Sequence, residues 1–335
     1  AYLRALVDYW RDGYDWRAHE RAMNELPQLR TAIEGVPIHV VHARGVEVFA
    51  LARSDASARA VEALGATSVR GDLDDRAAMQ AGMTGADVVI HAAAHVAEHG
   101  PLADFLRVTV TGTENTLAAA RAAGVARFVH ISTEAVLADG KPIIRADETR
   151  PRTLHPAGPY PHSKGLAEER VLAANAPGFA TIIVRPRFIW GAGDTSLIPK
   201  ISAAVKSGRF AWIGGGRYLT STCHIDNVIE GTLLAAERGA PGAIYFLTDG
   251  DPVEFRGFLT ELLGAYGATP GDRSIPLWLA RTIAATTSWM KQPPVTRTAV
   301  ALIGQEVTVV DAKARRDLGY TSHISRERGL AEIRG

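Results

Sequence analysis

The sequence predicts an α/β fold in which helices cover both faces of a parallel sheet. Residues 88–90 and 128–131 are short runs of consecutive apolar side chains, as expected of strands with two buried faces. Helical spacing of apolar residues over 106–123 separates these two runs. Strand and helix alternate as far as 181–184, which is typical of parallel sheets because each parallel crossover needs about a dozen residues or more.

Each predicted element rests on one of two apolar patterns. A helix is predicted where apolar residues recur every three or four positions, as at Ala58, Val61 and Leu64. A strand is predicted where the apolar run is short and turn residues bound it. In chain order this gives a strand at 46–51, a helix at 58–64, strands at 67–69 and 88–90, a helix at 106–123, a strand at 128–131, a helix at 160–174 and a strand at 181–184.

Composition argues against several classes of protein. The 37 lysines and arginines nearly balance the 36 acidic residues, so no overall field would attract nucleic acid or an anionic membrane. A single cysteine, Cys223, excludes an internal disulfide and indicates a reducing compartment. The first turns carry charges rather than a signal-peptide core, and no apolar run is long enough to span a membrane. We therefore expect a cytoplasmic protein without an integral membrane span.

Residues 1–44 differ from the rest of the chain. Residues 38–41 are expected to pair with the strand at 46–51 as an antiparallel hairpin, because the connection is too short for a parallel crossover. The segment, with its Tyr14-Asp15-Trp16-Arg17 run, resembles the N-terminal region of microsomal-type epoxide hydrolases. The hydrolase core, with its nucleophilic aspartate elbow, does not follow.

The most informative stretch is Tyr160-Pro161-His162-Ser163-Lys164 at the start of a predicted helix. Side chains four positions apart share one helix face, so the ammonium of Lys164 can favour the ionised form of the Tyr160 phenol. A phenol of this kind is suited to general acid–base chemistry. The spacing also arises by chance on ordinary helix surfaces, so its weight depends on the motifs around it.

Six such motifs occur in a defined order along the chain. They are Gly71-Asp72-Leu73, His91-Ala92-Ala93-Ala94, Ser132-Thr133, Tyr160-x-x-x-Lys164, Arg185-Pro186 and His224-Ile225-Asp226-Asn227-Val228. In order and spacing they resemble those of the extended short-chain dehydrogenases. Within this superfamily, residues 45–333 resemble the NAD-dependent epimerase/dehydratase and 3β-hydroxysteroid dehydrogenase-like branch, and the segments 293–297 and 313–320 favour the latter.

The resemblance implies a Rossmann-like, doubly wound parallel sheet with a smaller C-terminal substrate lobe. The family opens with a strand, a Gly-x-x-Gly-x-x-Gly turn and a helix that holds the cofactor pyrophosphate. No such turn precedes Val46, so we expect the usual first βα unit to be lacking. The predicted domains are the epoxide-hydrolase-like segment at 1–44, an incomplete dinucleotide-binding domain at 45–186 and a mostly substrate-binding lobe at 187–335, from which a strand near 244–248 returns to the sheet.

The activity that the resemblance implies is NAD(P)-dependent interconversion of a secondary alcohol and a ketone on a bulky, sterol-like substrate. Tyr160 would be the general acid or base, and Lys164 would assist it and reach the nicotinamide ribose. Thr133 would hydrogen-bond the substrate oxygen. A strand-end hydroxyl that caps the next loop is the alternative reading of Thr133.

The resemblance also implies a set of cofactor-binding residues. These are Arg53, Ser54, Asp72, Leu73, Ala92, Ala93, Ala94, Lys164 and Pro186. Arg53 stands where an acidic residue would hold a free ribose 2′-hydroxyl, which favours NADP. An arginine is also common at a solvated strand end, so NAD stays open.

The chain departs from the family pattern at two places, and the first of them leaves an alternative function open. The absent Gly-rich turn would remove the main partner of the pyrophosphate, which suggests a pseudoenzyme or binding protein of the same fold. Thr109 replaces an asparagine beside the active site, which puts a proton relay through that position in doubt. Epoxide hydrolysis is a third alternative, invited by residues 1–44 alone.

The remaining features have structural readings. His224 and Asp226 lie two apart, but Asp226 is predicted to be a helix N-cap, so no metal site is expected. Trp278 and Trp289 are predicted to line a substrate pocket or a core helix, with a membrane-surface helix as the alternative. The expected partners are a small-molecule substrate and, at most, a second copy of the chain in a homodimer.

Overall fold

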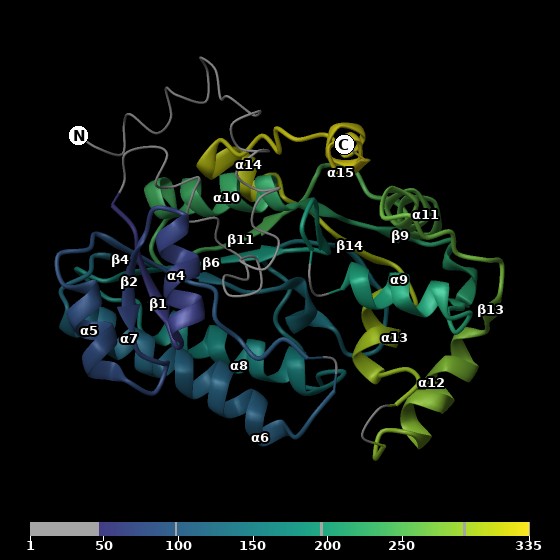
Figure 1. The fold of residues 1–335 in the computed structure, drawn as a ribbon, viewed down its shortest axis with the longest axis horizontal. Helices are drawn as coiled ribbons and strands as arrows, with labels where there is room; N and C mark the ends of the chain where they lie inside the picture. The colour runs from purple at the N-terminus through teal and green to yellow at the C-terminus, as the bar shows by residue number, and fades with distance from the viewer. Residues whose placement is uncertain (1–46, 98, 195–196, 291–292, 335) are drawn as a thin grey trace.

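A computed structural model describes residues 47–97, 99–194, 197–290 and 293–334, and its centre is a four-stranded, all-parallel sheet (Figure 1). The strand order in this sheet is β11-β6-β4-β3, and β1 and β2 form a separate parallel pair. The strands are β1 (Phe49–Ala52), β2 (Thr67–Arg70), β3 (Val88–His91), β4 (Arg127–Ile131), β6 (Ala180–Pro186) and β11 (Ile244–Leu247). The predicted α/β fold with a parallel sheet is confirmed.

Helices cover both faces of the central sheet, as the two-sided apolar runs predict. In Figure 1, α10 (Ile225–Arg238) and α14 (Ala312–Leu318) lie above the sheet, and α7 (Gly112–Ala122) and α8 (Pro159–Ala173) lie below it. Neighbouring strand residues point to opposite faces. Val129 and Ile182 therefore join the core on the α10 side, whereas Phe128 and Ile183 join the core on the α7 and α8 side.

The pairing of strands breaks at one position. Among the described residues, β1 pairs only with β2, and β3 pairs only with β4. In the usual doubly wound order, the first strand lies between the second and the fourth. Those two strands correspond to β1 and β3 here, so the break falls where the family's first strand belongs. The hairpin predicted for residues 38–41 lies outside the described residues.

The helical stretch before β4 is divided into three parts. The predicted helix at 106–123 corresponds to α6 (Leu102–Phe105), a wider turn at Leu106–Thr111 with π-helical bonding, and α7. The Thr113 hydroxyl donates to the Thr109 carbonyl at 2.6 Å, a side-chain bond that competes with the regular backbone ladder. Short π-helical turns of this kind often accompany functional sites.

The C-terminal lobe is built from short strands and helices around an aromatic core. A mixed sheet joins β5 (Ile143–Ala146), β9 (Leu219–Thr220), β12 (Val253–Glu254) and β14 (Val307–Val309). The helices of the lobe are α9 (Ile198–Lys206), α11 (Phe255–Ala265), α12 (Leu277–Thr286), α13 (Arg297–Ile303) and α15 (Arg326–Arg334). Although β5 lies within the predicted dinucleotide domain, it pairs with β14 of this sheet. The domain division therefore stays a prediction.

Two short pairs of parallel strands complete the lobe, and the predicted N-cap of its neighbouring helix α10 is wrong. The pairs β7 (Ile189–Trp190) with β10 (Cys223–His224), and β8 (Trp212–Ile213) with β13 (Ser274–Ile275), are parallel. Asp226 is not the N-cap of α10, because that helix begins at Ile225 and Asp226 lies inside its first turn. His224 is the N-cap, and its Nδ1 accepts the Asp226 backbone N–H at 3.3 Å. None of the described helices is both long and apolar enough to cross a bilayer.

The sheet core offers a test of this packing. Phe128 is fully buried between β4 and the α7 and α8 layer, so Phe128→Ala should lower the free energy of unfolding by about 3–5 kcal/mol. Ile144 in β5 is 60% exposed, and Ile144→Ala should change it by less than about 0.5 kcal/mol. Urea unfolding of both variants measures the difference. Equal losses would contradict the core described above.

Candidate active site

The carboxyl ends of β1 and β2 bring two predicted cofactor residues together. Ala52 pairs in register with Arg70, so Arg53 and Asp72 follow neighbouring strand ends. Their side chains form an ion pair at 3.9 Å (Arg53 Nη1 to Asp72 Oδ2), and both are more than half exposed. A solvated pair of this kind contributes little to stability, so Arg53 can exchange its partner for a ligand anion at small cost.

Ser54 and Leu73, two further predicted cofactor residues near these strand ends, also stabilise the local structure. Ser54 caps α4 (Asp55–Ala63), and its hydroxyl accepts the Ser57 backbone N–H at 3.1 Å. Leu73 lies before α5 (Arg76–Met83); its carbonyl accepts the Asn115 amide at 2.8 Å, and a Cβ at Gly112 would overlap its side chain. This region therefore has a fixed shape, as a platform for an adenosine group needs.

Small residues follow β3. Ala92, Ala93 and Ala94 are partly or fully exposed, so the strand end is open to a ligand. The loop is then tied to the helix below it, because the His95 N–H donates to the Thr109 hydroxyl at 3.0 Å. The threonine that departs from the family pattern thus has a structural role here.

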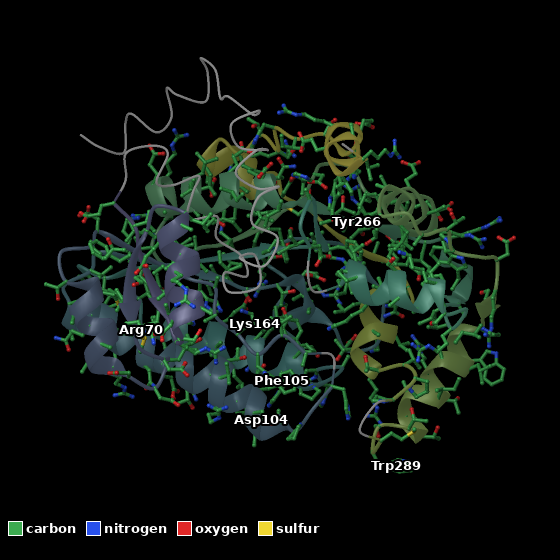
Figure 2. All side chains as sticks on the ribbon, in the orientation of Figure 1. Arg70, Asp104, Phe105, Lys164, Tyr266 and Trp289 are labelled. Atoms are coloured by element: carbon green, nitrogen blue, oxygen red, sulfur yellow. The ribbon has the colours of Figure 1, made fainter. Side chains whose placement is uncertain are left out.

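Lys164 is the most constrained side chain of the site. It lies on α8, is only 2% exposed, and its Nζ donates to the Ile131 carbonyl at the end of β4 at 2.6 Å (Figure 2). Burial disfavours the ammonium and lowers the pKa of Lys164 from 10.5 to about 8, while the nearby Glu168 carboxylate opposes that shift. The lysine therefore stays mostly charged at neutral pH.

Tyr160 precedes Lys164 by one turn of the same helix. It is half-buried in the first turn of α8, which begins with Pro159, where a missing N–H costs nothing. Gly158 precedes the helix because a Cβ there would overlap the Thr298 hydroxyl at the start of α13. The phenol and the ammonium share one helix face, as the spacing predicts.

Thr133 is committed to neighbouring groups. Its hydroxyl donates to Glu134 Oε2 at 2.8 Å and accepts the Ala135 N–H at 3.2 Å, so it caps the short helical turn Glu134–Leu137. Glu134 is itself held by Arg187 at 3.2 Å, and both are buried. Thr133 therefore has the capping role that the alternative interpretation gave it. A substrate oxygen could accept a hydrogen bond from its hydroxyl only after displacing the Glu134 carboxylate.

Sequence reasoning assigned no role to several buried polar residues beneath the site. Glu168 and Arg185 form a bidentate pair at 2.8 and 2.6 Å that joins α8 to β6, which ends at Pro186. The four-residue spacing of Lys164 and Glu168 could have indicated that Glu168 lies on the same helix face as Lys164. The rings of His91 and His130 stack at 5.4 Å, and burial with the Lys164 charge nearby lowers both pKa values, that of His91 to about 3. Both imidazoles are therefore neutral.

A large cavity opens beside the start of α8. Its volume is about 990 Å³, and Gly158 and Pro159, immediately before Tyr160, form part of its wall. Ala284 of α12 lines the cavity, but Trp278 and Trp289 are 67% and 82% exposed. The prediction that this segment forms a pocket wall or core is right for the small residues Ala280 and Ala284 and wrong for the two tryptophans, because α12 (Leu277–Thr286) turns its small residues inward. Trp289 follows the end of that helix, and Figure 2 shows it at the molecular edge.

One cluster in the described part of the chain has the residue types of a metal site. His224, Asp226 and Glu332 offer ligand atoms within 4.8 Å of one another. The Nδ1 of His224 already accepts a backbone N–H, and a Cβ at Gly329 would lie 3.0 Å from its Nε2. The ring is therefore packed on both sides, and we assign no metal to it.

The sheet with Tyr160 and Lys164 on one helix face defines an oxidoreductase of the short-chain dehydrogenase type. The chain belongs to the 3-beta hydroxysteroid dehydrogenase/isomerase family, whose sequence model matches residues 26–277. This match begins at residue 26, within the segment assigned to epoxide hydrolases, and no comparison supports that assignment.

Three known proteins illustrate the similarity. A 4-hydroxy-2-methyl-3-oxo-4-farnesyl-3,4-dihydroquinoline-1-oxide ketoreductase of Stigmatella aurantiaca is 50% identical over 299 residues, 87% of this chain and 90% of that protein. A 2-alkyl-3-oxoalkanoate reductase of Stenotrophomonas maltophilia is 34% identical over 306 residues, 87% of this chain and 92% of that protein. A dTDP-glucose 4,6-dehydratase structure from Streptomyces venezuelae with NAD bound has a TM-score of 0.67 at 23% identity, over 94% of this chain and 91% of that one.

These similarities decide among the predicted functions. The predicted class, an NAD(P)-dependent oxidoreductase, is confirmed. The pseudoenzyme and epoxide-hydrolase alternatives gain no support from the relatives.

The buried lysine generates a pH prediction. Since the folded pKa of Lys164 lies below the unfolded value of 10.5, burial destabilises the protein fully below pH 8 and not at all above pH 10.5. Wild type should therefore gain up to about 3 kcal/mol of unfolding free energy relative to Lys164→Met as pH rises through this window. Urea unfolding of both proteins at pH 7, 8, 9 and 10 measures this, and parallel curves would contradict the burial of a charged amine.

Proposed function

We propose that the protein reduces a ketone on a bulky, largely apolar substrate, and oxidises the corresponding secondary alcohol in reverse. The supporting observation is the cavity of about 990 Å³ whose wall includes the residues immediately before Tyr160. Two relatives are named as ketoreductases or oxoalkanoate reductases of substrates with farnesyl or alkyl groups. A cavity of this size accommodates such a substrate.

The residues at the strand ends fit the adenosine half of a dinucleotide. Arg53 and Asp72 lie side by side in solvent, Ala92 leaves the neighbouring strand end open, and Leu73 is anchored beneath them. NAD(P)H bound there would supply a hydride from C4 of its nicotinamide to the substrate carbonyl carbon. Lys164 lies at the carboxyl end of β4, on the side where a ribose would be expected.

Tyr160 supplies the proton in the proposed reaction. As the carbonyl carbon accepts the hydride, the carbonyl oxygen takes the phenolic proton, and solvent then returns a proton to Tyr160. The ammonium of Lys164, fixed by the Ile131 carbonyl, stabilises the negative charge that develops on the phenol. The sum is ketone, NAD(P)H and one proton giving alcohol and NAD(P)+. Thr133 would orient the oxygen once Glu134 has been displaced from its hydroxyl.

Turnover by variants tests the role of Tyr160. Tyr160→Phe should lower kcat for NADPH-dependent reduction of a long-chain 3-oxo substrate by about 10²–10⁴-fold, because the proton donor is lost. Tyr245→Phe is the matched control: Tyr245 is buried in β11, away from α8, and its hydroxyl accepts the Ala240 N–H. The control should retain kcat within about two-fold. Unchanged kcat in Tyr160→Phe would refute the proposal.

The choice of cofactor forms a separate prediction. We propose that the protein prefers NADP, since the exposed guanidinium of Arg53 follows β1 where a 2′-phosphate would approach. Arg53→Glu should raise KM for NADPH by about ten-fold or more and leave KM for NADH nearly unchanged. Initial rates with both cofactors measure this. A lower KM for NADH in wild type would contradict the preference.

A further inference from the structure

The cavity beside Tyr160 carries an excess of basic side chains. Two arginines, Arg281 and Arg297, line it against the single acidic residue Asp139 among its described lining residues, and His99 and His155 also lie in the wall. The chain as a whole is nearly neutral, with a net charge of +1, so this local excess is not a property of the general surface. A concave surface that gathers one sign of charge concentrates ligands of the opposite sign.

The two arginines are not neutralised by the protein. Neither takes part in an ion pair with any carboxylate of the described residues, although many other arginines of the chain do, such as Arg185 and Arg187. Arg281 donates to the Gly140 carbonyl at 2.7 Å and to Gln305 Oε1 at 2.9 Å. These neutral partners hold its guanidinium at the wall. Both arginines are exposed, so their charges face solvent and are available to a ligand anion.

Arg297 lies close to the proposed reaction centre. It is the first residue of α13, and the next residue, Thr298, contacts Gly158 so closely that a Cβ there would overlap its hydroxyl. Gly158 is two residues before Tyr160. The packing of α13 against the start of α8 therefore places the backbone of Arg297 near the first turn that carries Tyr160.

The rest of the lining is suited to a hydrocarbon group. Leu102, Leu154, Val295 and Val300 contribute apolar side chains around the basic residues. A ligand that fills this cavity would thus need both an apolar part and an anionic part. A planar carboxylate matches a guanidinium by two parallel hydrogen bonds, which a neutral ester or alcohol cannot reproduce.

We propose that the cavity selects substrates that carry a carboxylate on an apolar chain, and that Arg297 is the residue that recognises it. Arg281 supplies the second positive charge. This inference rests on the proposed function for its placement beside the reacting ketone, whereas the binding of the carboxylate itself does not require turnover.

Binding of substrate-like probes tests the site directly. Isothermal titration of wild type, below micelle-forming concentrations, should give at least a ten-fold lower Kd for dodecanoate than for dodecanol. Arg297→Gln should reduce this ratio to within about two-fold. The matched control, Arg273→Gln, changes an exposed arginine outside the cavity and should preserve the ratio.

Dodecyl phosphate separates recognition of a carboxylate from simple attraction of anions. Binding of the phosphate at least as tightly as dodecanoate would overturn the assignment to carboxylates. Equal Kd values for dodecanoate and dodecanol, or an unchanged ratio in Arg297→Gln, would overturn the site itself.

A kinetic comparison distinguishes this inference from the proposed function. With NADP+ or NAD+, kcat/KM for 3-hydroxyhexadecanoate should exceed that for its methyl ester by ten-fold or more, and Arg297→Gln should remove the difference. Equal oxidation of acid and ester would refute carboxylate selection while the proposed function stands. Oxidation of neither, with Arg297-dependent binding of dodecanoate, would refute the proposed function while the binding site stands.

Discussion

The buried hydrogen bond between the Lys164 ammonium and the Ile131 carbonyl is the interaction on which the site depends. It joins α8 to the carboxyl end of β4, so the helix face that carries Tyr160 is held at the mouth of the sheet. Burial of the ammonium is unfavourable, and the bond to Ile131 and the nearby Glu168 carboxylate offset part of its cost. The same burial lowers the pKa of Lys164 to about 8. The ammonium proposed to assist Tyr160 is therefore kept in place at a cost in stability.

Two buried ion pairs support this arrangement from below. Glu168 and Arg185 tie α8 to β6, and Glu134 and Arg187 hold the turn that follows Thr133. Removing one member of such a pair usually costs about 3–5 kcal/mol, because the remaining charge stays buried. The helix that carries Tyr160 and the loop at the end of β4 are thus fixed to neighbouring strands, whereas α12 and α13 of the C-terminal lobe supply walls of the cavity proposed to hold the substrate.

The cofactor side is less enclosed than the substrate side. Arg53 and Asp72 are solvated, and β1 and β3 each have one strand neighbour among the described residues. Within the described part of the chain, the groups proposed to contact the adenosine half are few and partly or fully exposed. The cavity between α8, α12 and α13 is the part of the proposed site with the more enclosed walls.

The sequence alone determined the parallel sheet, the alternation of its strands with helices along the chain and the shared face of Tyr160 and Lys164, because these follow from local periodicity and from the four-residue spacing of a helix. It misplaced the N-cap of α10 and the side chains of Trp278 and Trp289, since a cap and the side of a segment that becomes buried depend on what packs against them. Only the tertiary structure decided that Lys164 bonds to Ile131, that Thr133 is committed to Glu134, and that Arg281 and Arg297 meet in one cavity. Those contacts join segments far apart in the chain or depend on the surrounding packing, and no local pattern specifies which distant group a polar side chain will reach.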